Sequence, residues 1–326
     1  MIGALALRLP RAVLRWTEDA WAYLAYDGEM ALAFEQGAVL AGLNDFTGLH
    51  PPIWHLFHNV IEAIAPVPML LLLSSVFFSL GAVFLASRLG GIPALLLATS
   101  PLQVAYAAEL NNTPSMALCA AWMWWAREKT LEKGGWSLAI AIAVSAWVHL
   151  LLAAMGLCVA GFLGRKQLFR CAALLGVSIL PLAPSLYEIL LSDQTAIQPP
   201  FKLHLILQDA LSRFGWIGLF LLVPAVQGAK RRPQLAKSFL ACWLTILLLQ
   251  WARIAAPHQF PYYLALSLPF ALLVQAGTQG PKMRVLLGMV VSLQAISTAR
   301  LNMGQVNAIN LDLGIRRAID VALEEA

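Results

Sequence analysis

Ten apolar segments follow one another between residues 66 and 300, and this succession limits the fold more than any other feature of the chain. Only 12% of the residues are charged, against roughly 25% in a soluble domain. A helix needs about 20 mainly apolar residues to cross the hydrocarbon core, so the shorter segments imply a thinned bilayer or helices that end early at a cavity. The sequence predicts an all-α fold, a polytopic transmembrane helical bundle of about ten spans. The segments cover residues 66–87, 91–108, 114–126, 134–148, 150–164, 171–190, 214–229, 238–254, 260–277 and 284–300.

The distribution of charge predicts the orientation of this bundle. Residues 134–164 could form one long helix or a hairpin that turns near His149. With residues 15–62 outside and one crossing per segment, the inner loops hold thirteen of the 22 basic residues, and every acid except Glu128 and Glu132 lies outside. One span over 134–164 would invert every later loop and break the positive-inside pattern, so we expect the hairpin. The inner basic residues are Arg88, Arg127, Lys129, Lys133, Arg165, Lys166, Arg170, Lys230, Arg231, Arg232, Lys237, Lys282 and Arg284.

The polar stretch Arg15–Glu62 precedes the bundle and differs from it in composition. It holds seven of the 17 acidic residues and three of the six histidines. Stretches of this length are usually functional or disordered, and the aromatic residues argue against disorder. We expect residues 1–14 to be the remnant of a first transmembrane helix, 15–65 an outer catalytic loop with amphipathic helices, 66–300 the bundle, and 301–326 an outer C-terminal tail.

The acidic pair Glu18 and Asp19 stands at the start of a predicted helix in the polar stretch. Both carboxylates can be first-turn charges that the helix dipole favours. Alternatively, one of them points into a cleft and acts as a general base. Adjacent residues of a helix do not share a face, so only one of the two can be the base.

Histidines follow in the second half of the same stretch. Pro51-Pro52 predicts an extended segment that leads into a helix, with Pro52 at its first position. His55, His58 and Glu62 then share a helix face and could bind a metal, but the spacing favours a solvated interfacial face. The four cysteines lie in apolar runs without metal-ligand spacing, which indicates packing rather than disulfide bonds or zinc.

A polar turn lies between the second and third apolar segments. Asn112 or Thr113 can cap the next helix, with Pro114 at its first position. This interpretation leaves Glu109 without a structural role, and an acid at a membrane boundary is a candidate functional residue.

Several other residues on the predicted outer side can bind a ligand. The alternatives are that His149 is a turn residue and that the two tyrosines are members of an interfacial aromatic belt. Arg253 can instead hold a phosphate, since a planar guanidinium group suits that geometry. These outer-side candidates are His149, Lys202, His204, Arg253, His258, Tyr262 and Tyr263.

Five short motifs, taken in order, resemble the GT-C superfamily of integral-membrane glycosyltransferases, which includes protein O-mannosyltransferases and lipid A aminoarabinose transferases. The chain departs from that pattern in several ways. Its acidic pair has Glu before Asp where members have Asp before Glu, and it has Glu109-Leu-Asn111-Asn-Thr113 where members often carry Glu-x-Arg-x-Tyr. The first helix is nearly absent, and the large C-terminal outer domain of many members is missing. The motifs are ALALRL (Ala4–Leu9), EDAW (Glu18–Trp21), HPPI (His50–Ile53), SPLQVAYAAE (Ser100–Glu109) and FPYYLALSLP (Phe260–Pro269).

The resemblance implies an inverting transfer of a sugar from a polyprenyl-phosphate carrier to a lipid, glycan or protein acceptor, on the periplasmic face of a bacterial inner membrane. No cofactor is firmly implied; a divalent metal is compatible with the reaction but not required, and no nucleic acid is expected as partner. The implied catalytic residues are Glu18, Asp19 and Glu109, and the implied substrate-binding residues are His50, Asn111, Lys202, Arg253, His258 and Tyr262.

Two other kinds of protein fit part of this pattern. A non-catalytic transporter or assembly protein for lipid-linked saccharides, or an inactive family member, would also need a polar cavity, but a flippase is expected to carry polar residues through its spans and on both faces. A secondary transporter is expected to show broken helices in two related halves, and no such halves are visible. The concentration of polar residues on one face therefore favours the enzyme.

Overall fold

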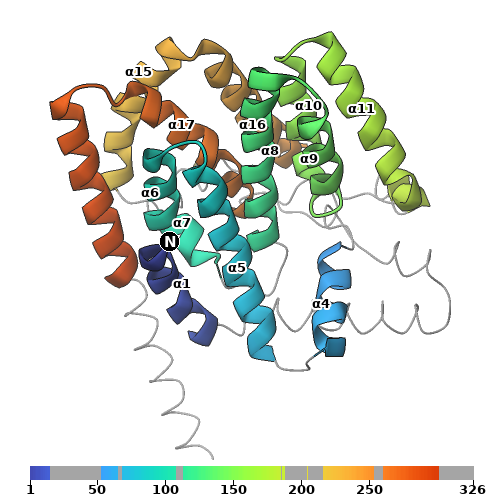
Figure 1. Ribbon diagram of the computed structural model, residues 1–326, viewed down its shortest axis with the longest axis horizontal. Coiled ribbons are helices and arrows are strands. Elements are labelled where there is room, and N and C mark those ends of the chain that lie inside the picture. The colour runs from blue at the N-terminus through green and yellow to red at the C-terminus, as the bar shows by residue number, and fades with distance from the viewer. Residues whose placement is uncertain are drawn as a thin grey trace, which may run out of the picture.

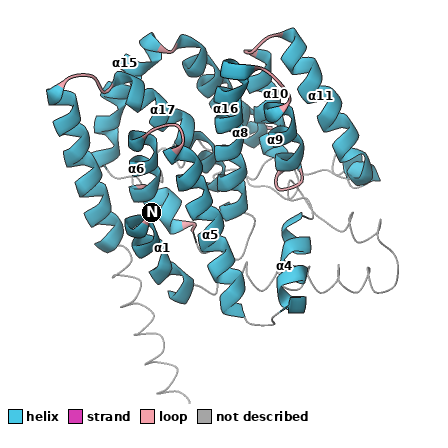
Figure 2. Cartoon of the chain, viewed as in Figure 1, coloured by secondary structure: helices cyan, strands magenta, loops and turns pink. Residues whose placement is uncertain are grey.

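The computed structural model describes residues 1–14, 53–64, 68–107, 113–184, 186–187, 204, 216–252 and 260–300. Within these ranges every regular element is a helix and no strand occurs (Figure 2), which confirms the all-α class. By length and apolar composition, one described helix, α16 (Pro233–Trp251), is able to cross a membrane on its own. The described structure therefore shows the helical class, and the ten predicted spans remain a prediction.

The helices pack side by side, and α8, α9, α10 and α11 run in alternating directions (Figure 1). A helix over residues 281–300 closes one edge of the bundle. The other elements are α1 (Ile2–Leu14), α4 (Ile53–Ile64), α5 (Pro68–Ser87), α6 (Gly91–Thr99), α7 (Pro101–Ala105), α8 (Thr113–Lys133), α9 (Ser137–Ala146), α10 (Leu150–Gly161), α11 (Arg165–Ile179), α15 (Leu222–Arg231) and α17 (Ser267–Gly277), with short 3₁₀ helices η1 (Leu180–Leu182), η2 (Trp216–Leu221) and η3 (Phe260–Leu266).

The predicted hairpin within residues 134–164 is confirmed. Helix α9 ends at Ala146, and α10 begins at Leu150. His149 lies between them as the N-cap of α10, where its Nδ1 atom accepts a hydrogen bond from the backbone N–H of Leu151 at 3.2 Å. The side chain thereby satisfies one of the N–H groups that the start of a helix leaves without a partner.

Several predicted segments differ from the structure at their ends. Helix α11 begins at Arg165 rather than at residue 171, and α16 begins at Pro233 rather than at residue 238, so basic residues expected in inner loops lie on helices. The segment 114–126 is longer, because α8 continues to Lys133 and stops at Gly134, whose φ of 69° favours glycine. Arg127 therefore lies on a helix and is buried, not on a loop. The segment 91–108 is two helices: Ser100 ends α6 and caps α7, its hydroxyl accepting from the N–H of Gln103 at 3.4 Å, and Pro101 occupies the first position of α7.

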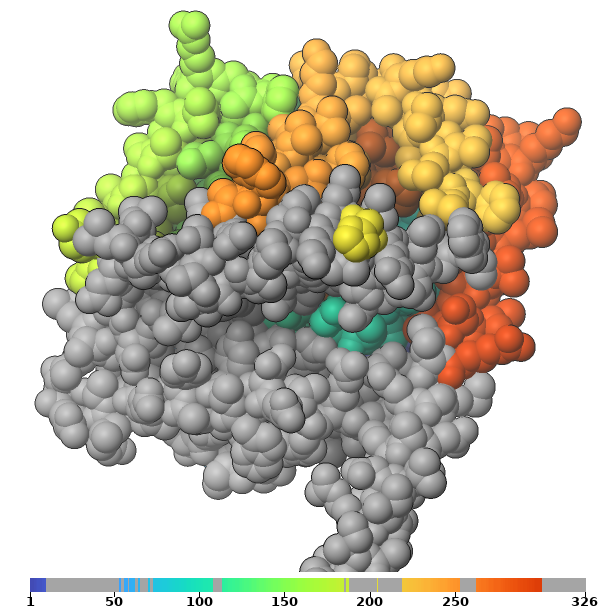
Figure 3. Space-filling model, turned by 180° about the vertical axis from the view of Figure 1, so that it is seen from behind, coloured from blue at the N-terminus to red at the C-terminus, as the bar shows by residue number. Residues whose placement is uncertain are grey.

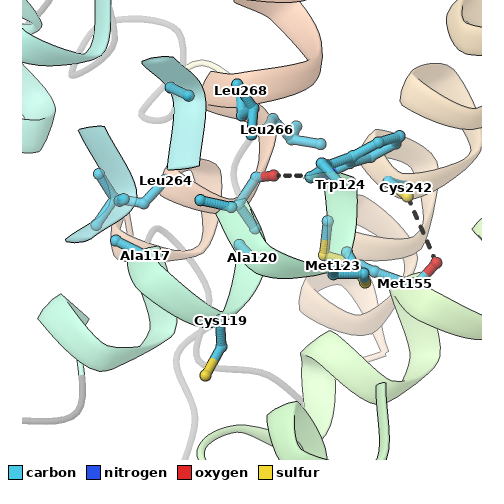
Figure 4. Packing of buried hydrophobic residues seen from close by; sticks show 14 of the residues in the cluster. Ala117, Cys119, Ala120, Met123, Trp124, Met155, Cys242, Leu264, Leu266 and Leu268 are labelled. Carbon is cyan, nitrogen blue, oxygen red and sulfur yellow. Dashed lines mark hydrogen bonds between the residues drawn. The ribbon is translucent and has the colours of Figure 1, made fainter. Parts of the chain in front are cut away.

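The core lies around α8, which contacts α5, α9, α10, α17 and η3. Trp124 of α8 is fully buried, and its indole N–H donates to the carbonyl of Ala265 at 3.1 Å. In the same hydrophobic cluster the thiol of Cys242 donates to the carbonyl of Met155 at 3.6 Å, which joins α16 to α10 (Figure 4). All four cysteines are free thiols; three of them are buried and Cys158 is half-buried.

Helices α15 and α17 approach each other closely because each has a glycine at the contact. A Cβ atom on Gly228 would lie 1.8 Å from the carbonyl oxygen of Leu273, and one on Gly277 would lie 1.7 Å from that of Pro224. Neither contact leaves room for any side chain. Glycine at both positions therefore sets the distance between these two helices.

The turns that carry the predicted inner basic residues gather at one end of the bundle, toward the top of Figure 1. Gln275 of α17 donates to the carbonyl of Leu89 at 3.3 Å, and Arg231 donates to that of Ala276 at 2.8 Å. Arg232, at the α15–α16 turn, pairs with Glu128 of α8. We call this the basic end, and the end where α9 turns into α10 the site end.

Candidate functional site

The site end is assembled from four parts of the chain that are far apart in sequence. The backbone N–H of Ile53, at the start of α4, donates to the carbonyl of Trp147 in the α9–α10 turn at 3.4 Å. The short helix η3 packs against α7, α8 and α16. The first residues of α4 and η3, the end of α7 and the end of α16 are thus all connected to this end.

Of the residues that the resemblance implies as catalytic or substrate-binding, the structure describes Tyr262, which is buried at the site end; of the other outer-side candidates it describes His149, Tyr263 and the exposed His204. The ring of Tyr262 lies edge-on to the imidazole of His149, with centroids 5.3 Å apart and an interplanar angle of 75°. The buried position does not fit the alternative of a lipid-facing aromatic belt. Because Nδ1 of His149 accepts a hydrogen bond, the neutral ring carries its proton on Nε2.

A second polar contact lies next to this pair. The hydroxyl of Tyr263 donates to Oε1 of Gln250 at 3.2 Å, and Gln250 is fully buried near the end of α16. Buried polar side chains are stable only when hydrogen-bonded, so the bond fixes η3 against α16. We call His149, Gln250, Tyr262 and Tyr263 the polar cluster.

The other predicted site residues lie outside the described part of the chain, but the described segments that lead to them meet at the site end. Ala107 precedes Glu109 and Asn111, Ala252 precedes Arg253, Ile53 follows His50, and Phe260 follows His258. The residues outside the described part are Glu18, Asp19, His50, Glu109, Asn111, Lys202, Arg253 and His258. A helix after Pro51-Pro52 is confirmed by α4. Within the described ranges, no three His, Cys, Asp or Glu residues are close enough to hold a metal ion.

The predictions from sequence did not anticipate the role of Arg8. This arginine is fully buried, and its guanidinium group donates to the hydroxyl of Ser79 at 2.8 Å and to the carbonyls of Leu97, Ala98 and Ala4 at 2.9, 3.0 and 3.2 Å. The carbonyls of Leu97 and Ala98 end α6, where a positive charge also interacts favourably with the helix dipole. The signal in the sequence was one charge inside the apolar stretch ALALRL.

The hydroxyl of Thr298 completes this arrangement by donating to the carbonyl of Thr99 at 3.2 Å. Three successive carbonyls at the end of α6 are therefore bound by side chains from α1 and from the helix over residues 281–300. The break between α6 and α7 is held from both sides, and the chain continues from it through Ala107 toward Glu109.

At the site end, buried tyrosine, histidine and glutamine side chains lie beside the described segments that lead to the predicted site residues. No family model, no curated protein and no solved structure matches this chain.

Proposed function

We propose that this protein is an integral-membrane glycosyltransferase that moves a sugar from a polyprenyl-phosphate carrier to an acceptor at the outer face. The observation that carries the proposal is the convergence at the site end. Ala107, Ala252, Ile53 and Phe260 are each within a few residues of a predicted site residue, and contacts among α4, α7, α16, η3 and the α9–α10 turn bring their segments together. Sequence motifs that are up to two hundred residues apart thus lead to one region.

The surface of the bundle supports a membrane location with about ten spans. Large apolar side chains are exposed along the outer faces of several helices, and Phe169 of α11 is 74% exposed. Figure 3 looks at the side on which α11, α15, α16 and the helix over 281–300 reach the surface. Soluble monomers rarely expose apolar area on this scale. Further exposed side chains are Phe77, Val177, Leu222, Val223, Val226, Leu244, Leu248, Val285, Met289 and Ile296.

The separation of charge along the bundle supports the orientation. The basic end fits the cytoplasmic side by the positive-inside rule, which leaves the site end on the outside. A polyprenyl tail would then lie along the apolar helices, and its phosphate and sugar would reach the polar region at the outer face.

The chemistry assigned to the site uses residues of this chain alone. Glu18 or Asp19 takes the proton of the acceptor hydroxyl as its oxygen attacks the anomeric carbon, and the bond to the carrier phosphate breaks with inversion. Arg253, His258 and Lys202 stabilise the negative charge on the leaving phosphate. Glu109, His50, Asn111 and Tyr262 bind and orient the sugar-phosphate group.

The test uses the purified protein in lipid vesicles with a panel of labelled undecaprenyl-phosphate sugars. We expect release of sugar to water or to an added acceptor, and loss of turnover by at least about a hundredfold in Glu18→Gln or in Asp19→Asn. Glu29→Gln, in the same polar stretch, is the matched control and keeps turnover. Binding of the carrier lipid without turnover, unchanged by either substitution, would overturn the enzyme and favour a transport or assembly protein for lipid-linked saccharides.

A further inference from the structure

A small basic and aromatic surface lies at the basic end, where the α8–α9 loop contacts the first turns of α11. Gly134 and Gly135 have φ values of 69° and 97°, so the loop turns within two residues. The carbonyl of Gly135 accepts hydrogen bonds from the side chains of Gln167 at 3.2 Å and Arg170 at 3.4 Å. The loop is therefore held against α11 in one conformation.

Cations and an indole ring meet on this surface. The guanidinium carbon of Arg170 lies 5.4 Å from the centre of the Trp136 ring, and Trp136 is 51% exposed. Lys166 is exposed and lies one helical turn before Arg170, so the two share a face of α11. Lys133 is exposed at the end of α8, directly before the two glycines. We call Lys133, Trp136, Lys166 and Arg170 the headgroup surface.

Among the described residues, no acidic side chain forms an ion pair with Lys133, Lys166 or Arg170, although the charge of Glu132 lies near Lys133. Glu132 pairs with Lys129 at 2.8 Å, and Glu128 bridges Arg127 and Arg232. The first turn of α11 contains two basic residues and no acid, and its N-cap, Gly164, offers no side-chain cap. Positive charge at the positive end of a helix dipole is unfavourable unless an anion is nearby.

Aromatic side chains border these cations. Phe162 and Phe169 are exposed, one before and one after the first turn of α11 in sequence. Tryptophan and basic residues together are typical of the boundary between lipid headgroups and hydrocarbon. A soluble anion would use the cations but would gain nothing from exposed phenylalanine side chains.

We propose that the headgroup surface binds the phosphate of an anionic phospholipid in the leaflet at the basic end. Lys133, Lys166 and Arg170 hold the phosphate oxygens, Trp136 lies at the level of the headgroup, and Phe162 and Phe169 contact the acyl chains. The inference rests on the membrane location within the proposed function, but not on sugar transfer.

The experiment compares two double variants of the full chain in lipid nanodiscs that contain phosphatidylglycerol and phosphatidylcholine. Lys133→Gln/Lys166→Gln removes two charges from the headgroup surface, and Lys230→Gln/Lys237→Gln removes two exposed charges from the α15–α16 turn at the same end. None of these four lysines makes a hydrogen bond or ion pair within the described residues. Both variants are therefore expected to fold like the parent protein.

The readout is the number of phosphatidylglycerol molecules that remain bound when the protein is released from the nanodiscs, measured by native mass spectrometry. Each lysine near an anionic headgroup changes affinity by about fivefold, so we expect at least about fivefold loss of retained phosphatidylglycerol in the headgroup variant and little change in the control. Equal loss in both variants, or no preference for phosphatidylglycerol in the parent, would overturn the site. A protein that transfers sugar but shows no lipid preference would contradict this inference alone, and one that keeps the preference without transfer would contradict only the enzyme.

Discussion

The buried side chain of Arg8 is expected to contribute strongly to the free energy of unfolding. Replacing it with methionine keeps the apolar stem but leaves the carbonyls of Leu97 and Ala98 and the hydroxyl of Ser79 without their partner. Hydrogen bonds to a charged group contribute about 1.5–3 kcal/mol each, so we expect Arg8→Met to lower the free energy of unfolding by about 3 kcal/mol or more. Arg8→Lys keeps the charge with fewer donors and should lose less.

The measurement for this pair is thermal unfolding of the purified variants in detergent. Thr298→Val serves as a comparison, because it removes a single neutral hydrogen bond at the same end of α6 and is expected to cost about 1 kcal/mol. An unchanged melting temperature for Arg8→Met would contradict the role assigned to the guanidinium group.

Two substitutions of His149 measure how much its cap on α10 contributes to the free energy of unfolding. Asparagine can also accept a hydrogen bond from the N–H of Leu151, so His149→Asn should keep the stability of the parent, whereas His149→Ala should lose about 1 kcal/mol. Unfolding curves of the three proteins measure this difference. If both variants lose stability equally, the contact between the imidazole and the ring of Tyr262 contributes more than the cap does.

At the scale of helices, the close contact between α15 and α17 leads to a prediction about the stability of glycine-to-alanine variants. Gly228→Ala and Gly277→Ala each add a methyl group that would overlap a carbonyl oxygen of the facing helix. The helices must therefore move apart, and we expect the free energy of unfolding to fall by about 3 kcal/mol or more. Gly176→Ala and Gly288→Ala are matched controls in helices, because no atom lies within 4 Å of their added methyl group. These controls should gain about 0.5–1 kcal/mol from better helix propensity. Stability like that of the parent at Gly228 or Gly277 would show that the two helices are not in backbone contact.

Helix positions could be predicted from the sequence, but their partners could not. Segments 66–87 and 150–164 match α5 and α10 closely because glycine, proline or charge interrupts the apolar run at each end. The extension of α8 is not visible in the sequence, because Arg127 resembles a loop cation until its partner is known: it pairs with Glu128, which also pairs with Arg232. The break at Ser100 depends on Arg8 and Thr298, which lie about ninety and two hundred residues away. Periodicity carries no information about such partners.

Most of the candidate site rests on motifs in sequence rather than on described side chains. Tyr262 was found through an aromatic-rich motif, and its burial against His149 came only from the structure. Gln250 gives no functional signal in the sequence, because a single amide in an apolar run resembles an ordinary packing position. Its bond to Tyr263 joins η3 to α16, a contact between elements that no local pattern specifies.

At the scale of the whole molecule, the basic turns lie at one end of the bundle and the polar cluster lies at the other. Whether these two ends lie on opposite sides of a membrane can be tested without knowing the substrate. Lys133→Cys and Lys282→Cys introduce single cysteines at the basic end. Ile64→Cys introduces one at the last residue of α4, where the side chain is 80% exposed. A membrane-impermeant maleimide applied to intact cells should label Ile64→Cys strongly and the other two only after the membrane is opened. The parent protein controls for its own cysteines, of which three are buried and Cys158 is half-buried. Labelling of all three positions from outside would place both ends in the same compartment, and the bundle would then not cross the membrane in the way that its charge distribution predicts.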